Sequence, residues 1–290
     1  MRNALSDAAA AAALRTPAHE RRFTRLASIL VQSPHTYGLA RRAMQTLSKR
    51  LCASGDVRRP LRIGHVRFQI DVTGDVLREM YWAGVMCEPQ TTAWMLAHVQ
   101  PNARVVDVGA NVGYYTLLAA RLVGPEGRVV AFEPNPVVRA QLERHVCDNG
   151  VQDRVSIDPT ALADGDANDR DLFVPEASAE SGLASLTRGP ALTTRAASAV
   201  PVRCERLDDW LERSRVDRID VIKIDVEGGE AAVVAGMRRA LERLRPGHIV
   251  CETTWEGAAH RALIDAGYAA EPLDWFDRDR GTANVLFRAL

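Results

Sequence analysis

The chain has 290 residues, 47% of them hydrophobic, and its 37 Lys and Arg are balanced by 37 Asp and Glu. This length and apolar content suit one large α/β domain with an extension, and no apolar run approaches the roughly 18 residues of a membrane-spanning helix. The five cysteines are scattered and form no C-x-x-C pair, which argues against a disulfide framework or zinc site and indicates reduced thiols in a cytoplasmic protein.

The first sixty residues are strongly basic. They hold eleven Lys and Arg against three acids, so residues 1–60 stand at +8 and the remainder at −8. Apolar residues recur at helical spacing from Leu26 to Leu51, which predicts two amphipathic helices broken near Ser33-Pro34. A basic arm is suited to nucleic acid or an anionic membrane, but we favour a helical cap or a contact between copies in a homo-oligomer. Residues 1–60 are therefore expected to form a basic helical extension.

Residues 61–100 are expected to lead into the main domain. Hydrophobic and polar residues alternate over 61–76, which predicts a β-hairpin. Pro89 is placed to open a helix that runs toward Pro101. The segment Gly84–Pro89, just before that helix, is a candidate wall for the ligand site that lies beyond it in the chain.

The stretch Val105–Thr116 organises the rest of the chain. It is typical of a buried strand, a tight glycine turn and the first turn of a helix. Asp107 stands near the carboxyl end of that strand, and Gly109 and Gly113 allow positive φ and close approach of the backbone. Glu133 ends the next apolar strand, 26 residues after Asp107. This spacing fits a βαβ unit that presents an acid to ribose hydroxyls.

The remainder of the domain, residues 101–290, alternates between strand and helix patterns. Helices are expected at 113–123, 136–149, 207–211, 230–244 and 257–266, and strands at 104–108, 128–132, 155–157, 221–224, 248–251, near 268 and at 284–287. The last two strands have no helix between them, so we expect a doubly wound, mostly parallel sheet that closes with an antiparallel hairpin. Residues 163–200 are rich in small polar residues and are expected to form a long loop, with an edge strand at 200–202.

The glycine turn departs from the dinucleotide fingerprint. Asn111 stands where G-x-G-x-x-G requires its second glycine, so the spacing is G-x-x-x-G. Asp107 would repel a pyrophosphate but suits a ligand with a cationic ammonium or sulfonium group. S-adenosylmethionine carries both groups and has no phosphate. We therefore expect it as the cofactor.

A second motif begins at Lys223, one of only two lysines in the chain. Lys223, Asp225 and Glu227 alternate, so they share a face if strand geometry persists. The lysine either serves the chemistry or pairs with an acid to satisfy buried charge. Asp225 or Glu227 would serve as a general base or as a ligand to a divalent ion, and the sequence does not separate these roles. His145 is expected on a helix face far from the strand ends, and His260 on a peripheral helix.

The phrases at 107–116, 132–136 and 222–230 together resemble the FkbM family of S-adenosylmethionine-dependent methyltransferases. The resemblance covers residues 80–255, and the K-x-D-x-E-G phrase after Ile222 makes it specific. It implies a class I, Rossmann-like methyltransferase fold. It also implies an O-methyltransferase that acts on a hydroxyl of a small molecule, namely a natural product, sugar or glycolipid.

The resemblance also assigns roles in cofactor binding. Gly109, Ala110, Asn111 and Gly113 would line the methionine and ribose side, and Glu133 would take the ribose hydroxyls. The glycine turn would therefore bind the methyl donor, and its sequence does not indicate which molecule accepts the methyl group.

The remaining roles lie farther along the site. Pro134 and Asn135 would flank the adenosine, Asp164 would approach the adenine amino group, and Asp225 would lie beside the transferred methyl group. Glu88 would add an acid from the segment before Pro89, although Met86-Cys87 stands where the family has an aromatic residue.

Two other functions remain open from the sequence. One is methylation of nucleic acid, which only the basic arm supports, since the chain lacks the N/D-P-P-Y/F motif of amino-methylating enzymes and its catalytic part is acidic. The other is a non-catalytic domain that binds S-adenosylmethionine as a partner module. The presence of all cofactor-site phrases favours an enzyme with a hydroxyl acceptor, and nucleic acid is the weaker expectation.

Overall fold

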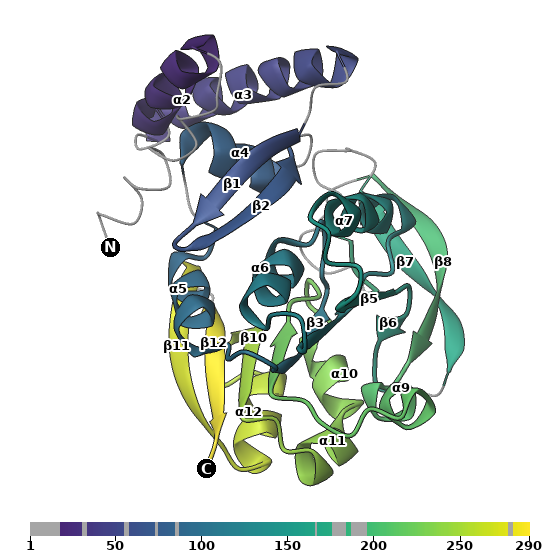
Figure 1. Ribbon diagram of the computed structural model, residues 1–290. Coiled ribbons are helices and arrows are strands. Elements are labelled where there is room, and N and C mark those ends of the chain that lie inside the picture. The colour runs from purple at the N-terminus through teal and green to yellow at the C-terminus, as the bar shows by residue number, and fades with distance from the viewer. Residues whose placement is uncertain are drawn as a thin grey trace. The chain divides into compact units, whose positions relative to one another are not determined.

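The structure is a computed structural model (Figure 1) that describes residues 18–30, 34–54, 58–72, 75–84, 87–165, 167–175, 184–186, 196–277 and 281–290. The chain forms two compact units, residues 1–92 and 93–290. Within the described ranges, no helix combines the length and apolarity needed to cross a membrane.

The first unit contains three helices that pack around Trp82. They are α2 (Ala18–Leu30), α3 (Pro34–Ser54) and α4 (Asp75–Ala83). The Trp82 side chain is fully buried, and its Nε1 donates to Ser48 Oγ on α3 at 3.1 Å. Its ring meets Phe23 of α2 edge to face at 5.4 Å between centroids. One aromatic side chain thus joins the three helices, because its apolar body and its polar N–H both find partners.

A β-hairpin follows α3 in the same unit. Strands β1 (Arg58–Ile63) and β2 (Val66–Asp71) pair antiparallel, with Ile63 opposite Val66. Gly64 in the connecting turn has φ 58°, a conformation that suits glycine. The hairpin expected from the alternating pattern is therefore present. Helix α5 (Pro89–His98) opens at the proline, as expected.

The second unit is built on a seven-stranded sheet with the order β11-β12-β10-β9-β3-β4-β5. The strands are β3 (Arg104–Val108), β4 (Arg128–Phe132), β5 (Val155–Asp158), β9 (Val221–Ile224), β10 (His248–Thr254), β11 (Tyr268–Asp277) and β12 (Thr282–Ala289). The neighbouring strands from β10 to β5 pair in parallel, and β12 pairs antiparallel with both β10 and β11. This confirms the expected Rossmann-like sheet with an antiparallel C-terminal hairpin, which is the class I methyltransferase architecture.

Helices cover both faces of this sheet (Figure 1). They are α6 (Tyr114–Leu122), α7 (Pro136–Asp148), α9 (Leu207–Ser214), α10 (Glu230–Ala235), α11 (Arg238–Arg243) and α12 (Ala258–Asp265). In Figure 1, α6 and α7 lie on one side and α10 to α12 on the other. The central strand β9 is buried at all four positions, which explains its unbroken apolar pattern apart from Lys223.

The single helix expected at 230–244 is wrong, because the chain forms α10 and α11 with a break between them. At Gly236 an added Cβ would lie 2.1 Å from the carbonyl oxygen of Ala163, so another segment of backbone passes close by. The Asp208 carboxylate then accepts from the backbone N–H groups of Arg239 and Ala240, both at 2.8 Å. It caps the new helix from a distant part of the chain, a contact that local periodicity does not reveal.

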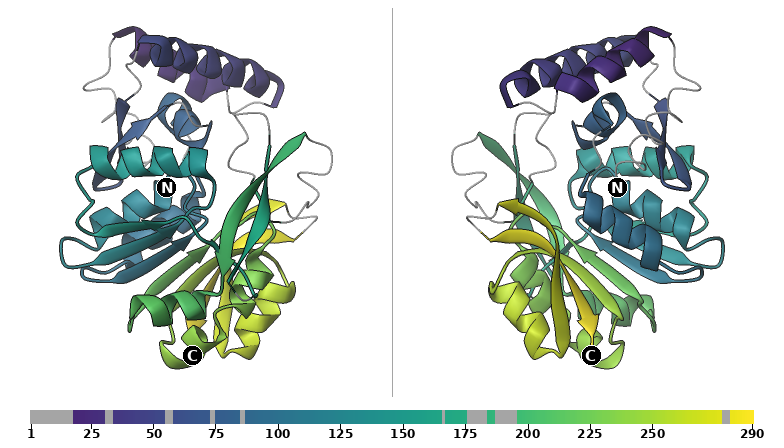
Figure 2. Two further views of the ribbon diagram at one scale, coloured as in Figure 1. Left: turned by 90° about the vertical axis from the view of Figure 1, so that its right-hand side faces the viewer. Right: turned by 90° about the vertical axis from the view of Figure 1, so that its left-hand side faces the viewer.

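The long loop expected at 163–200 instead contains part of a small sheet. Its strands are β6 (Ala161–Leu162), β7 (Asn168–Pro175) and β8 (Ala197–Glu205), in the order β6-β8-β7. β7 and β8 form an antiparallel ribbon that extends from the main sheet (Figure 2). Residues 176–183 and 187–195 of the expected loop lie outside the described residues. Apolar side chains on one face of the ribbon are sparse but alternate, which suffices for a half-buried strand pair.

Candidate active site

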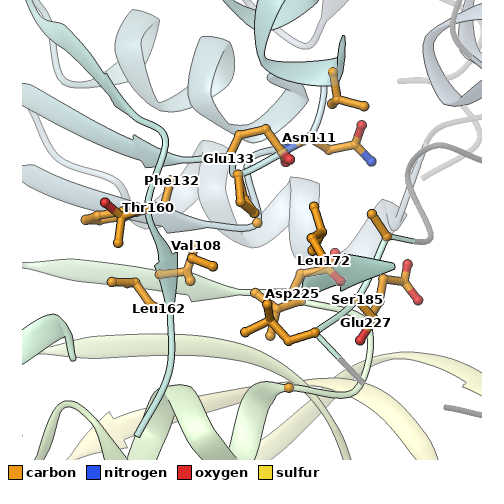
Figure 3. Close-up of a pocket in the computed structure, with 18 residues that line it drawn as sticks. Val108, Asn111, Phe132, Glu133, Thr160, Leu162, Leu172, Ser185, Asp225 and Glu227 are labelled. Atoms are coloured by element: carbon orange, nitrogen blue, oxygen red, sulfur yellow. The ribbon is translucent and has the colours of Figure 1, made fainter. Parts of the chain in front are cut away.

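A pocket lies at the carboxyl ends of β3, β4 and β9, and the small sheet forms part of its wall (Figure 3). Its polar side chains are Asn111, Glu133, Thr160, Ser185, Asp225 and Glu227, and its apolar ones include Val108, Phe132, Val138, Leu162, Leu172 and Leu186. Figure 3 shows Thr160 and Leu162 on one side and Ser185 and Glu227 on the other. Three of the lining residues are acidic, and none of the described residues that line the pocket is Lys, Arg or His. This charge is unsuited to a pyrophosphate and suited to a cationic ligand.

The glycine turn forms one rim of the pocket. Gly109 has φ 81°, and an added Cβ would meet the carbonyl oxygen of Asp225 at 1.8 Å. Only glycine fits at this position, because the turn needs a positive φ and the Asp225 carbonyl leaves no space for a side chain. Both reasons hold without a bound ligand. Asn111 also adopts a left-handed conformation, with φ 51°, which asparagine tolerates better than most residues. Its Oδ1 accepts from the N–H of Val112 at 2.7 Å.

Other residues of the turn support it from behind. Ala110 is buried and donates its N–H to the carbonyl of Phe132 at 2.9 Å, and Gly113 is the N-cap residue of α6. Asp107 is buried and accepts from Thr116 Oγ1 at 2.6 Å. Asp107, Ala110 and Gly113 do not line the pocket, so direct contact of Asp107 with the cofactor stays a prediction.

Glu133 lines the pocket from the end of β4. One carboxylate oxygen accepts from the N–H of Asn111 at 2.8 Å and the other from the N–H of Asn135 at 2.9 Å. Burial raises the pKa of Glu133 to about 7, and these two backbone hydrogen bonds oppose that shift. Each oxygen retains a second lone pair, so the carboxylate can accept from a ribose diol without losing its backbone partners.

The segment after β4 is fixed by helix capping. Asn135 is buried, and its side chain accepts from Val137 N at 3.1 Å as the N-cap of α7. Pro134 lines the pocket directly beside Glu133. The structure therefore brings Pro134 to the site and gives Asn135 a structural contact.

The opposite wall begins after β5. The Asp158 carboxylate accepts from Thr160 N at 2.9 Å and from Trp210 Nε1 at 2.8 Å, which orders the segment that carries Thr160 into the pocket. Asp164 lies farther along, is about half exposed and pairs with Arg170 at 3.7 Å. It is not part of the pocket lining, and its contact with an adenine amino group stays a prediction.

A buried charge cluster occupies the ends of β9 and β10. Lys223 Nζ lies 3.0 Å from Asp225 Oδ2 and 4.7 Å from the centre of the Tyr115 ring, and its side chain is only 2% exposed. Cys251 pairs with Ile224 across the parallel strands, so the next residues, Glu252 and Asp225, lie side by side. The Glu252 carboxyl forms a hydrogen bond with Asp225.

The neighbours in this cluster shift the pKa values of Glu252 and Asp225 in opposite directions. Burial and the Asp225 carboxylate raise the pKa of Glu252 well above its usual range. Burial would also raise the pKa of Asp225, but the Lys223 ammonium and the hydrogen bonds from Glu252 and Lys223 outweigh it and lower that pKa. At neutral pH the cluster therefore holds a protonated Glu252 and an ionised Asp225 beside Lys223.

Glu227 reaches the pocket from a strained loop. Strand geometry stops at Ile224, and Glu227 and Gly228 are both left-handed, with φ 54° and 98°. The face-sharing expected for Lys223, Asp225 and Glu227 thus holds for the first two, while the loop places the third. Glu230 Oε1 fixes this loop by accepting from the N–H groups of Val226 and Gly228 at 3.2 and 3.0 Å.

Sequence reasoning missed three supporting residues, namely Glu252, Glu230 and His145. Glu252 could have been found from its place at the end of the strand beside β9. His145 was expected far from the strand ends, but its buried Nδ1 lies 2.6 Å from the carbonyl of Val112 in the glycine turn. Because a carbonyl only accepts, Nδ1 carries the proton in this contact. His145 therefore braces the turn and is not placed as a base.

Two expectations, the role of Glu88 and a divalent ion, are not tested by the residues that line this pocket. Glu88 belongs to the first unit, has φ 42° and accepts from Thr92 N through its own carbonyl, so its role toward the cofactor stays a prediction. Among the described residues, no group of three or more His, Cys, Asp or Glu side chains is arranged to hold a metal ion. A divalent ion at Asp225 or Glu227 likewise stays a prediction.

The chain is similar to known methyltransferases. Residues 107–270 match the methyltransferase FkbM domain. The chain is 29% identical to methyltransferase sdnD of Sordaria araneosa over 194 residues, which cover 59% of this chain and 73% of that protein. It is 26% identical to 2-O-methyltransferase NoeI of Sinorhizobium fredii over 159 residues, which cover 50% and 62%.

Two further relatives carry the FkbM name. The 31-O-demethyl-FK506 methyltransferase FkbM of Streptomyces tacrolimicus is 30% identical over 164 residues, which cover 49% of this chain and 62% of that protein. This match and the one to NoeI each span less than two thirds of the relative. A crystal structure of methyltransferase FkbM from Methylobacillus flagellatus KT aligns with a TM-score of 0.40 and 18% identity, over 64% of this chain and 43% of that one. The domain match extends over more than half of the sequence, and the chain therefore belongs to the FkbM family of S-adenosylmethionine-dependent methyltransferases.

Proposed function

We propose that this protein is an O-methyltransferase that transfers the methyl group of S-adenosylmethionine to a hydroxyl of a small molecule such as a natural product, sugar or glycolipid. The observation that carries the proposal is the position of Asp225, an ionised carboxylate that lines the pocket between the glycine turn and the loop of Glu227. A hydroxyl acceptor needs a group that takes its proton, and an amine acceptor has less need of one.

The donor half of the pocket fits the cofactor by its chemistry. Glu133 offers acceptors for the ribose hydroxyls, Pro134 and Leu162 offer apolar surface for the adenine, and Asn111 borders the space toward the methionine part. When bound, S-adenosylmethionine supplies an electrophilic methyl group on a cationic sulfonium. The Asp225 carboxylate would favour such a cation at the far end of the site.

The acceptor half would be formed by Asp225, Glu227 and the small sheet. Asp225 and Glu227 would orient the acceptor hydroxyl and one of them would take its proton, while Leu172 and Leu186 would exclude water from the acceptor. The contact with Lys223 lowers the pKa of Asp225 and so keeps this carboxylate ionised. The same lowered pKa makes Asp225 a weaker proton acceptor. Glu227, the other acid at this end of the pocket, is the second candidate for the base.

The names of the relatives support oxygen as the acceptor atom. NoeI is a 2-O-methyltransferase, and the enzyme from Streptomyces tacrolimicus acts on a 31-O-demethyl compound. A nucleic acid substrate is less well supported. The described residues that line the pocket include three acidic side chains and no Lys, Arg or His, and such a lining would repel phosphate groups.

The test has two stages. Calorimetric titration with S-adenosylmethionine comes first, and a lack of binding at millimolar ligand would remove the cofactor assignment. Radiolabelled methyl transfer is then measured with a matched acceptor panel of alcohols, the corresponding amines, and an RNA. Label on an alcohol, lost in Asp225→Asn and kept in the exposed control Asp217→Asn, supports the proposal. Label on an amine or RNA alone contradicts it.

A further inference from the structure

The first unit presents a face that takes no part in the proposed chemistry. This face consists of exposed side chains of α2 and α3 and is called the outer face. Its residues are Arg22, Arg25, Leu26 and Ile29 of α2 and Leu39 and Arg42 of α3. Within the first unit, α2 and α3 are neighbouring helices (Figures 1 and 2), and each of them carries exposed apolar and cationic side chains.

The α2 part of the outer face mixes large apolar and cationic side chains. Positions 22, 25, 26 and 29 follow the i, i+3, i+4, i+7 spacing that aligns side chains along one side of a helix. Leu26 is 54% exposed and Ile29 is 65% exposed. Ala27 lies on the other side and is buried. Helix α2 thus buries Ala27 on one side and exposes Leu26 and Ile29 beside its arginines on the other.

The α3 part repeats this arrangement. Ala40, Met44 and Ser48, spaced by four, are buried on the inner side. Leu39 is 64% exposed, and Arg42 is exposed beside it. The two adjacent arginines of α3 differ in their surroundings. Arg41 pairs with Glu79 at 3.3 Å, whereas Arg42 is exposed.

These two helices carry a large net positive charge. Residues 18–54 contain seven Lys and Arg and a single acid, Glu20, so their formal charge is 7 − 1 = +6. Helix α3 contains no Asp or Glu at all. A partner for this face must therefore be anionic over an extended area.

The kind of partner follows from the apolar residues among the cations. A nucleic acid backbone offers no apolar surface for Leu26, Ile29 and Leu39 to bury. A second copy docking through the same face would bring two cationic surfaces together with no acid between them. An anionic bilayer satisfies both parts of the face, since its headgroups attract arginines and its acyl boundary accepts aliphatic side chains.

We propose that the outer face of α2 and α3 binds the surface of anionic lipid bilayers, with both helices lying in the plane of the interface. The arginines pair with lipid phosphates and carboxylates, and the three aliphatic side chains enter the boundary between headgroups and acyl chains. This proposal does not depend on the acceptor assigned above, because it concerns the first unit alone.

The test is co-sedimentation of the full chain with vesicles. Vesicles of phosphatidylcholine with phosphatidylserine should bind the protein, and vesicles of phosphatidylcholine alone should not. Binding should weaken as salt rises from about 0.1 M to about 1 M, where the screening length falls from roughly 10 Å to roughly 3 Å. Equal binding to both vesicles, or binding to neither, overturns the proposal.

Matched variants assign the binding to this face. Arg22→Glu with Arg25→Glu should lower partitioning at least about 25-fold, since each cation near an anionic surface contributes roughly fivefold. Arg144→Glu with Arg238→Glu changes the charge equally at exposed arginines of the second unit, and it should lower partitioning less than about twofold. A larger effect of this control pair than of the first pair would contradict the assignment.

The apolar residues need a separate variant. Leu26→Ser with Ile29→Ser should lower partitioning about tenfold without changing its salt dependence. Cofactor titration and thermal unfolding check that every variant is folded. A protein that self-associates through this face, shown by a mass that Arg22→Glu with Arg25→Glu reduces, and that binds no vesicle would overturn the proposal in favour of a contact between copies.

Discussion

Replacing Glu133 by Gln is the sharpest test of the donor half of the site. The carboxylate is 7% exposed and accepts two backbone N–H groups, from Asn111 and Asn135. Gln offers one acceptor oxygen in place of two, and its amide turns a donor toward one of these backbone donors. The variant thus keeps the shape of the side chain and removes both its charge and half of its accepting capacity.

The expected loss follows from the hydrogen bonds that we propose between Glu133 and the ribose. A hydrogen bond to a charged group contributes about 1.5–3 kcal/mol, so a net loss of roughly 2–3 kcal/mol is expected, or about 30- to 150-fold in affinity. The pH dependence is a second signature. Burial raises the pKa of Glu133 to about 7, so the carboxyl is protonated below that pH and ionised above it. Affinity of the unaltered protein should therefore fall about tenfold from about pH 8 to about pH 6.

The assay is calorimetric titration with the demethylated cofactor, S-adenosylhomocysteine, which keeps the ribose diol and permits no turnover. The variant should show weak binding with little pH dependence, so the ratio between the two proteins should shrink toward pH 6. Glu143→Gln makes the same chemical change at an exposed position of α7 and should leave both quantities unchanged. Unaltered affinity in Glu133→Gln at about pH 8 would show that the ribose binds elsewhere.

Four further predictions concern the acceptor side and the frame. Asp225→Asn should abolish methyl transfer to the acceptor found by the panel while cofactor binding persists, and retained turnover would move the base to another residue. Glu252→Gln keeps a hydrogen-bond donor for Asp225 and should retain most of the turnover near neutral pH. Glu252→Ala should lower the turnover at least roughly tenfold, because the buried Asp225 carboxylate loses that donor. Equal turnover in the two variants would contradict this role. Gly109→Ala should destabilise the second unit by roughly 3 kcal/mol or more, measured by urea unfolding, since its Cβ would overlap the Asp225 carbonyl; a change below about 1 kcal/mol would refute the close approach. Asp208→Ala should lower the unfolding free energy by about 1–3 kcal/mol because two N–H groups at the start of α11 lose their cap, and an unchanged midpoint in the same assay would argue against that capping.

The parts of the molecule with strong local signals were predictable from the sequence. Strands β3 and β4 coincide with the expected ranges because each is a short Val-rich run that a turn signal follows, Gly109 after β3 and Pro134 after β4. The donor side of the pocket follows from them, since Glu133 must emerge where β4 ends. The antiparallel closing hairpin was also predictable, because no helix pattern separates its strands.

The parts that escaped prediction depend on contacts between distant segments. The cap that Asp208 provides to α11 joins residues about thirty positions apart, and no periodicity in 230–244 marks it. Glu252 acquires its raised pKa only through the register of β10 against β9, which sets it beside Asp225. The ribbon was obscured because the apolar residues are few, diluted by Asn, Asp and Arg in β7 and by Ala, Ser and Arg in β8.

That ribbon has a consequence for how the pocket could be changed. The donor turn and the Asp225 strand are locked together at Gly109, where the backbone of one leaves no space for a side chain of the other. The ribbon contributes Leu172 to the pocket but belongs to a separate three-stranded sheet with its own small core. We therefore expect that replacement of β7 and β8 would change the pocket wall at Leu172 and leave the contact at Gly109 intact.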